Sequence, residues 1–293
     1  MIRSERMSNY VTYHLHTELS LLDSCTNFKL YVDKAKELGQ EAICFSEHGN
    51  IYNWIEKKMY CKEQGIKYLH GVECYLTEKL FHTNEETGEQ SKVRDNYHTI
   101  LIAKNYAGFQ ELNTLVDLST QEDHFYYKPR LTFDEFKNIS RNIIKISACL
   151  ASPLNKLRDE SLIKYYDYLE VQPHINSEDQ KEYNKWLYQM SVKHNKPLIA
   201  GTDTHNLNKY KAECRSILQK AKHIVFTNED EFDLTYKSYD ELVEMFKQQG
   251  VLPEREYLDA LENTEIMAAS VEDFELDTSF KYPKLYEDEE KVF

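Results

Sequence analysis

Seven short apolar runs alternate with helix-like stretches along the first two thirds of the chain. The runs cover residues 10–16, 41–48, 67–76, 97–105, 142–150, 166–173 and 196–205. Apolar residues three and four positions apart mark the intervening stretches 27–39, 53–65, 105–120 and 179–194. Strands that alternate with helices are typical of βα units around a parallel sheet. Seven strands favour a closed or nearly closed α/β barrel, with a doubly wound open sheet as the alternative.

The length and the end of the chain suggest a barrel with an appendage. The chain has 293 residues, and helical patterns at residues 238–250 and 255–271 follow one another without strands. We therefore predict a barrel domain over residues 8–208 and a mainly helical extension over residues 209–293. From Arg215 onward the chain carries 20 acidic and 9 basic residues, so most of the net charge of −14 lies in this extension.

The composition bears on the cellular location of the protein and on its partners. No apolar run approaches the about 18 residues of a transmembrane helix, and the first ten residues lack the apolar stretch of a secretory signal. The six cysteines form no CxxC pair, which favours reduced thiols. We expect a cytoplasmic protein without a membrane partner. The negative charge gives no support to a nucleic-acid partner, but bound cations would reverse the local sign.

Metal-ligand side chains recur at the ends of the predicted strands, where parallel α/β folds bind their ligands. Two histidines one residue apart end the first run and point the same way on an extended chain. The fourth run fits less cleanly, because its histidine stands at its beginning. The candidate ligands are His14, His16, Asp23, His48, Glu73, His98, Cys149, Asp203 and His205.

Each candidate alone has an ordinary structural explanation. Asp23 and Asp203 could cap a helix or organise a turn, Cys149 could be a small buried hydrophobe, and His98 could be structural. Together they put a ligand at one strand end after another. Nitrogen, carboxylate and thiolate ligands suit zinc, manganese or iron. Nine ligands, at three or four for each ion, indicate two or three divalent ions.

Several segments resemble the PHP (polymerase and histidinol phosphatase) family, and most closely the PHP domains that begin bacterial DNA polymerase III alpha subunits. The segments are YHLHTELSLLDS (13–24), SEHGN (46–50), GVECY (71–75), YHTILIAKN (97–105), FYYKPRL (125–131), SACLA (147–151) and GTDTHNLN (201–208). Residues 232–246 and 260–277 resemble the helical linker that precedes the polymerase palm. We find no palm-type aspartate cluster, so polymerase activity is not expected from this chain alone.

The resemblance implies a distorted (β/α)7 barrel and a residue-by-residue metal site. His14, His16, Glu73 and Asp203 correspond to the ligands of one ion. Glu73 would bridge to a second ion, also held by His98 and Cys149, and Asp23, His48 and His205 would hold a third.

Three further positions bear on the site. Glu47 stands where the family usually has an aspartate, which we expect to affect the orientation of His48. Lys128 and Arg130 are candidates for phosphate or partner contact, and a surface turn fixed by Pro129 explains them equally well.

The implied function is a metal-dependent phosphodiesterase, with a hydroxide held on the clustered cations attacking the phosphate. A 3′→5′ exonuclease acting on DNA or an oligonucleotide comes first. A scaffold module that docks on a polymerase catalytic chain or another replisome subunit is the alternative. A histidinol-phosphatase-like enzyme is less favoured, because Cys149 and the polymerase-like tail count against it.

Overall fold

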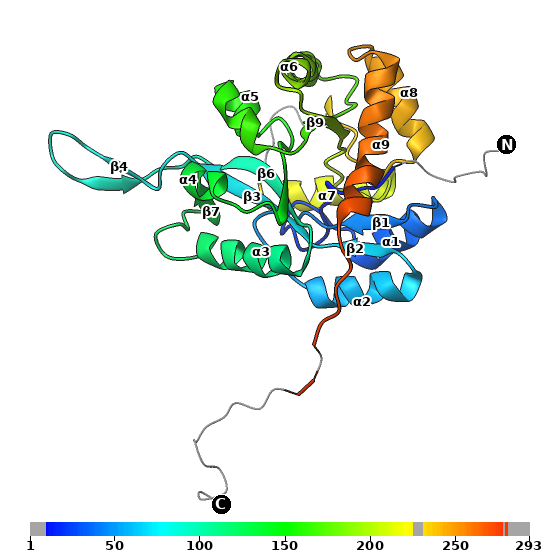
Figure 1. Cartoon of the computed structure of the whole chain (residues 1–293), viewed down its shortest axis with the longest axis horizontal. Coiled ribbons are helices and arrows are strands. Elements are labelled where there is room, and N and C mark those ends of the chain that lie inside the picture. Colours follow the sequence, from blue (N-terminus) through cyan, green and yellow to red (C-terminus); the bar gives the residue numbers. More distant parts are fainter. Residues whose placement is uncertain (1–9, 225–230, 278, 281–293) are drawn as a thin grey trace, which may run out of the picture.

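The computed structural model describes residues 10–224, 231–277 and 279–280 (Figure 1). Its α-helices are α1 Phe28–Glu37, α2 Trp54–Gln64, α3 Tyr106–Ser119, α4 Phe133–Lys137, α5 Pro153–Leu157, α6 Glu178–His194, α7 Lys209–Ala221, α8 Tyr239–Gln249 and α9 Glu254–Ser270, with a 3₁₀ helix at Glu160–Tyr165. Its strands are β1 Ala42–Cys44, β2 Lys67–Leu69, β3 Gly71–Thr77, β4 Phe81–Thr83, β5 Gln90–Lys92, β6 Tyr97–Ala103, β7 Arg130–Thr132, β8 Ile143–Ile146, β9 Leu169–Val171 and β10 Leu198–Ala200.

Local sequence signals explain where the helices begin and end. The Asn27 side chain accepts from the backbone of the first turn of α1, and Ser238 forms a capping box with Glu241 at the start of α8. Gly65 and Gly250 end α2 and α8 in the left-handed conformation, which glycine adopts without strain. The six helices expected from apolar periodicity are confirmed.

The largest sheet is mixed, so the expected parallel arrangement holds for only part of the strands. Its strands lie in the order β7–β3–β6–β8, and β6 runs antiparallel to both β3 and β8. The chain passes from β3 to β6 through the β4–β5 hairpin instead of a crossover helix, and this route reverses its direction. The hairpin projects away from the body (Figure 1).

The remaining runs pair in parallel over very short lengths. β1 pairs with β2, and β9 pairs with β10. The first run forms isolated parallel bridges, Thr12 with Ile43 and Leu15 with Thr204, and another bridge joins Ile146 to Tyr168. In the described part of the chain the named strands do not join into one continuous closed sheet. The fold is mixed α/β.

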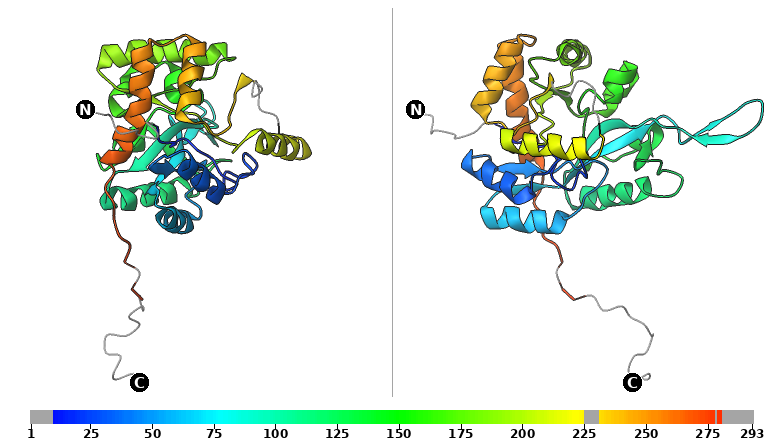
Figure 2. Two further views of the ribbon diagram at one scale, coloured as in Figure 1. Left: turned by 90° about the vertical axis from the view of Figure 1, so that its right-hand side faces the viewer. Right: turned by 180° about the vertical axis from the view of Figure 1, so that it is seen from behind.

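Helices α8 and α9, side by side in Figure 2, pack on the same body as the strands. Met267, Ala268 and Val271 share a buried cluster with Val11 and Ile199. The division at residue 208 stays a prediction, and the last part of the expected extension lies outside the described residues. Among those residues, no helix combines the length and apolar character needed to cross a membrane. All six cysteines are free thiols, as expected.

Candidate metal centre

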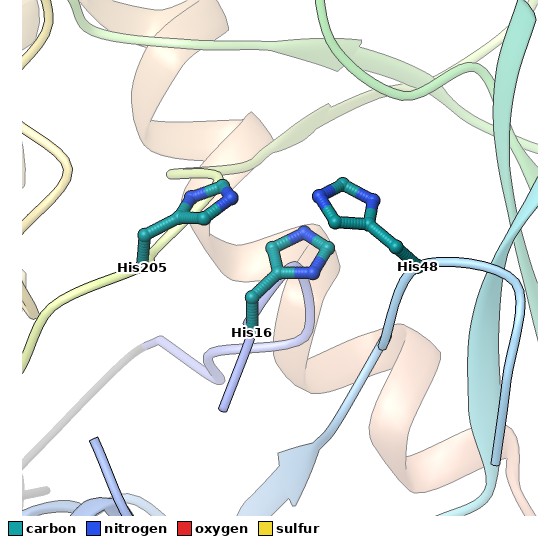
Figure 3. A group of neighbouring side chains, drawn as sticks. All are labelled: His16, His48 and His205. Atoms are coloured by element: carbon teal, nitrogen blue, oxygen red, sulfur yellow. The ribbon is translucent and has the colours of Figure 1, made fainter. Parts of the chain in front are cut away.

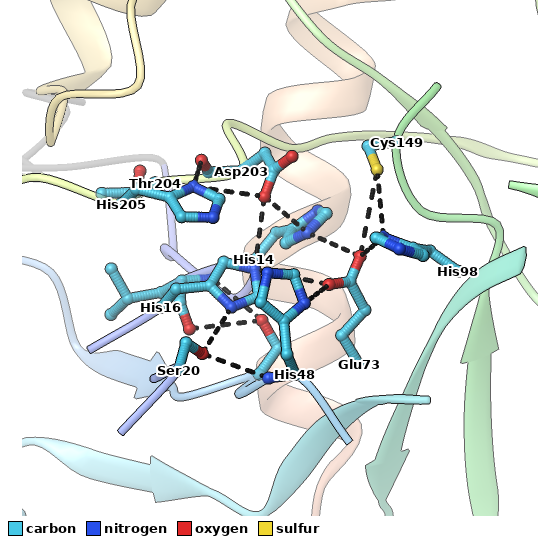
Figure 4. A network of polar contacts seen from close by, with 12 residues as sticks. His14, His16, Ser20, His48, Glu73, His98, Cys149, Asp203, Thr204 and His205 are labelled. Atoms are coloured by element: carbon cyan, nitrogen blue, oxygen red, sulfur yellow. Dashed lines mark hydrogen bonds and ion pairs between the residues drawn. The ribbon is translucent and has the colours of Figure 1, made fainter. Parts of the chain in front are cut away.

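The structure brings the nine predicted ligand side chains together at the carboxyl ends of the parallel strands, and Figure 4 labels all of them except Asp23. Glu73, fully buried in β3, lies at the centre. Its Oε1 lies 3.3 Å from His14 Nε2 and 3.0 Å from His98 Nδ1. Its Oε2 lies 3.5 Å from His16 Nε2 and 2.7 Å from His48 Nδ1. One carboxylate therefore touches four imidazoles, the arrangement expected of a bridging ligand.

The direction of β6 explains why His98 belongs to this group although it opens its strand. Tyr75, near the carboxyl end of β3, pairs with His98 in the antiparallel register. The start of β6 thus lies at the same edge as the ends of the parallel strands. Cys149 follows β8 and reaches this corner, with its Sγ 3.6 Å from His98 Nδ1 and 3.9 Å from Glu73 Oε1.

Asp203 closes the other side of the group. Its Oδ1 lies 3.0 Å from His14 Nε2 and 3.2 Å from His16 Nε2. The residue adopts φ of 46°, in the left-handed region that non-glycine residues rarely occupy. Such backbone conformations cluster at functional sites.

Asp23 joins the two remaining histidines. Its Oδ2 lies 3.0 Å from His48 Nε2 and 3.4 Å from His205 Nε2. The ring of His16 stacks between them, with centroid distances of 4.1 Å to His48 and 4.4 Å to His205 (Figure 3). Arg215 of α7 holds Asp23 through both its backbone carbonyl and its carboxylate.

Five ligand atoms in this group are buried and have no hydrogen-bond partner among the described residues. They are His14 Nε2, His16 Nε2, His48 Nδ1, Glu73 Oε2 and Asp203 Oδ1. Buried polar atoms are nearly always satisfied, and leaving one unpaired costs about 1–3 kcal/mol. Three sets of three side chains bring their ligand atoms within 4.8 Å of one another: His14–His16–Glu73, His48–Glu73–His98 and His16–His48–His205. The residues present fit divalent cations.

Neighbouring residues fix which nitrogen of His14 and of His16 is free. His14 Nδ1 donates to Glu170 Oε1 over 2.8 Å, because a carboxylate only accepts, and this leaves a lone pair on Nε2. Ser20 donates to Glu47 over 2.6 Å and accepts from His16 Nδ1 over 3.0 Å. In both cases Nε2 faces the other ligands, and partners of this kind orient metal-binding histidines.

Glu47 supports the site through Ser20, the residue that accepts a hydrogen bond from His16, and not through the ring of His48. Its carboxylate accepts from the Thr17 backbone, the Ser20 hydroxyl and the Lys57 ammonium, which lies 2.7 Å away. Burial would raise the pKa of Glu47, but Lys57 and the hydroxyl donors lower it to about 2. Glu47 is thus held in a buried ion pair with Lys57.

The electrostatics of the site keep its carboxylates charged. Burial lowers the pKa of His14, His48 and His205, but the neighbouring carboxylates outweigh burial and raise all three, that of His48 to about 10, so a bound cation would displace protons from these rings. Burial opposes the charge on Glu73, yet the imidazoles of His98 and His48 hold its pKa well below the usual range. Burial also opposes the charge on Asp203, but His14 and His205 lower its pKa well below the usual range. Burial lowers the pKa of His16 to about 3, so its ring is neutral and can act as a ligand.

The two phosphate-contact candidates differ. Arg130 is fully buried and donates to the backbone carbonyls of His124 and Val93, so it holds this loop and cannot reach a phosphate, contrary to our expectation. Lys128 is exposed, and its Nζ lies 5.0 Å from the ring centre of Tyr75. That ring lies 5.1 Å from His98, so Lys128 stays a candidate.

A cavity of about 420 Å³ opens beside the ligands. Besides Asp23, His48, His98, Cys149, Asp203 and His205, its lining includes Leu150, Lys156, Gln172, His174, Ser177, Asp179, Arg215 and Phe232. The sequence analysis missed Glu170, Ser20, Arg215 and His174. One feature of the sequence could have pointed to Glu170: it is an acidic residue inside the apolar run 166–173.

A mixed α/β fold with a buried cluster of histidine, carboxylate and thiol ligands at its strand ends defines a candidate metallohydrolase scaffold. The model of the PHP domain family matches residues 12–254. The chain belongs to the PHP domain family.

The curated relatives are replicative polymerase subunits. DNA polymerase III subunit alpha of Borreliella burgdorferi is 30% identical over 92% of this chain and 24% of its own length. The same subunit of Aquifex aeolicus is 31% identical over 94% of this chain and 26% of its own length. The chain thus spans about a quarter of these relatives. A two-domain protein from Bacteroides vulgatus containing a predicted PHP-like metal-dependent phosphoesterase is 13% identical, with a TM-score of 0.42 over 82% of this chain and 69% of its own.

Proposed function

We propose that this domain is a metal-dependent phosphodiesterase that degrades DNA from the 3′ end, as the PHP part of a polymerase III alpha-like protein. The observation that supports this most strongly is the set of five buried ligand atoms around Glu73 that face one another at 2.7–3.5 Å without forming hydrogen bonds. A site built only for packing would pair or remove such atoms. The alpha-subunit relatives make nucleic acid the substrate class to test first.

The ligand sets support two to three divalent ions, of zinc, manganese or iron. His14, His16 and Asp203 would hold one with Glu73, and His98 and Cys149 would hold another on the same carboxylate. Asp23, His48 and His205 would hold the third. Such ions, when bound, supply Lewis-acid activation of water and of the phosphoryl group near neutral pH.

The chain's own residues orient and screen this centre. Glu170 and Ser20 keep Nε2 of His14 and His16 directed at the ions. Arg215 keeps one oxygen of Asp23 occupied, so that the other faces His48 and His205. Lys128, at the edge beside Tyr75 and His98, is positioned to attract a phosphate.

We also propose that the strands form the distorted seven-stranded barrel that the family resemblance implies. Parallel bridges link the first run to β1 through Thr12, and Leu15 to Thr204, which follows β10. β1–β2, β3–β6, β6–β8 and β9–β10 supply further contacts, and the Ile146–Tyr168 bridge joins β8 to β9. These pairs and bridges support a closed ring of strands. Because the strands are short, isolated bridges make several of the connections in this ring.

The polymerase setting suggests partners and the scaffold alternative. Because the relatives are about four times longer than the matched region, a polymerase catalytic chain or another replisome subunit is a candidate partner, in the cytoplasm. In the scaffold alternative the metals only stabilise the fold. Hydrolysis of DNA separates the two functions, since a scaffold would bind metal without turning over substrate.

The test is hydrolysis of 5′-labelled single-stranded DNA by protein loaded with Mn²⁺ or Zn²⁺. We expect a ladder that shortens from the 3′ end and no cleavage of circular single-stranded DNA. Asp203→Asn, which removes one ligand charge, should abolish the ladder, whereas Asp134→Asn on exposed α4 should leave it unchanged. Cleavage of histidinol phosphate but not of DNA would overturn the proposal in favour of the small-molecule phosphatase.

A further inference from the structure

The cavity beside the metal centre continues well beyond the ligands. Its volume of about 420 Å³ lies within the range of sites for small organic ligands. Leu150, Ala151, Phe232 and Leu234 contribute apolar surface to its lining. A phosphodiester group alone needs polar contacts and little space. The cavity therefore has room for an apolar or aromatic part of the substrate attached to the phosphate.

His174 is one of the polar residues of this cavity that the metal centre does not use. It is 2% exposed, and its Nδ1 has no hydrogen-bond partner in the described part of the chain. The ring of Phe232 meets it edge to face, with centroids 4.8 Å apart at 88°. Gln249 of α8 donates to the His174 carbonyl over 3.0 Å, which fixes the backbone here.

A chain of hydrogen bonds determines which atom of His174 carries the proton. Glu170 accepts from Tyr13, from His14 and from the amide nitrogen of Gln172, the last over 2.7 Å. The amide oxygen of Gln172 is therefore turned toward His174 Nε2, 3.1 Å away, which must donate to it. Burial lowers the pKa of His174 to about 4, so the ring is neutral near pH 7. Its Nδ1 is left as a buried acceptor with an unused lone pair.

We propose that this cavity binds the terminal nucleoside of the substrate and that His174 Nδ1 accepts a hydrogen bond from a hydroxyl or N–H group of that nucleoside. This inference rests on the proposed function, in which the metal centre holds the attached phosphate. Phe232 and the neighbouring aliphatic side chains would then contact the base or sugar. His174 acts as a specificity-determining residue, because a ligand that lacks the donor leaves Nδ1 unpaired.

Two phosphodiesters with the same leaving group isolate the contribution of the nucleoside. Thymidine 5′-(p-nitrophenyl) phosphate carries the nucleoside, and methyl p-nitrophenyl phosphate does not. We expect His174→Gln, which keeps a polar side chain without an acceptor at Nδ1, to lower kcat/KM about 5- to 100-fold for the first diester only. Phe232→Ala should act in the same direction. His70→Gln changes an equally buried histidine that binds Tyr68 and Asn113, and should alter neither rate.

Binding to the metal-loaded protein gives a readout that needs no turnover. By calorimetry, thymidine 5′-monophosphate should bind more tightly than inorganic phosphate, and His174→Gln should remove this preference. Deoxyribose 5-phosphate separates a sugar hydroxyl from a base N–H as the donor. Equal losses for both diesters in His174→Gln, or no preference for the nucleotide over phosphate, would overturn the inference. If neither diester is hydrolysed, the proposed function is overturned instead. The calorimetric comparison of nucleotide with phosphate would still show whether the cavity binds a nucleoside.

Discussion

The two ends of the strands differ in how their polar groups are satisfied. At the carboxyl ends, five ligand atoms around Glu73 are buried without hydrogen-bond partners. At the amino ends, helix α9 supplies partners one by one. Thr264 Oγ1 accepts from the Val11 backbone over 2.9 Å, and Asn263 donates to the Leu198 carbonyl over 2.7 Å. Lys67 Nζ donates to the Ala268 carbonyl over 3.0 Å.

This difference indicates that the carboxyl ends of the strands bind a ligand and that the amino ends stabilise the fold. Unpaired buried groups cost stability unless a ligand completes them, whereas a capped end contributes stability outright. We therefore expect substitutions at the carboxyl ends to change metal binding with little loss of fold, and substitutions under α9 to do the reverse.

Glu73→Gln should have the largest effect. The substitution keeps the shape of the side chain but removes the negative charge that four imidazoles share. We expect loss of most bound metal, and a fall in diesterase kcat/KM larger than the about 10- to 100-fold typical of residues that only support ligands. Metal analysis and steady-state kinetics measure both. Full metal occupancy in the variant would show that Glu73 is not the shared ligand.

Met267→Ala probes the opposite end. Met267 is fully buried under the strands, and truncating such a side chain costs about 2–5 kcal/mol of unfolding free energy. Its neighbour Ile266 is 53% exposed, so Ile266→Ala should stay within about 0.5 kcal/mol of the parent. Urea unfolding measures both variants. The contrast breaks if Met267→Ala loses metal at a temperature where it remains folded.

Ser20→Ala should weaken metal binding without removing a ligand. The hydroxyl that accepts from His16 Nδ1 is lost, so the ring is free to turn its Nε2 away from the centre. We expect a fall in metal affinity of about 10- to 100-fold. Competition with a chromophoric chelator measures it. Ser119→Ala, at a buried serine of α3 that bonds only within its own helix, should leave the affinity unchanged.

The smallest effect is expected from the single hydrogen bond between α9 and the first run. Thr264→Val removes the hydroxyl that accepts from Val11 but keeps the side-chain volume. Thr264→Ser keeps the hydroxyl instead. Thermal unfolding should find the valine variant about 1 kcal/mol less stable than the serine variant, with metal content equal in both. A serine variant as unstable as the valine variant would assign the effect to packing instead.

The sequence was sufficient to predict six of the helices and the nine side chains that the structure brings together. Ligand residue types at successive run ends identified all nine side chains that meet at the centre, because residue identity and strand-end position are both local properties. His98 shows where this reasoning needs topology. The sequence of residues 97–105 does not show in which direction this strand runs in the sheet. The β4–β5 hairpin before β6 places the first residues of β6 at the edge where the ligands lie.

Other features could not be predicted, because they depend on register and on packing between distant segments. Glu170 reaches His14 across 156 positions, and Arg215 reaches Asp23 across 192. The pattern of residues 255–271 indicated an amphipathic helix, but it could not indicate that the apolar face covers the starts of the strands. Arg130 looked like a phosphate contact, because its sequence gives no sign that it is fully buried.

The metal content of the purified chain tests the central claim most directly. Elemental analysis of the native protein, His14→Ala and Asp203→Ala would be made after exposure to Zn²⁺ and Mn²⁺, with circular dichroism to establish folding. We predict two to three ions per native chain and fewer in both variants. A folded native protein that binds no metal, or variants that bind as much as the native chain, would contradict the account.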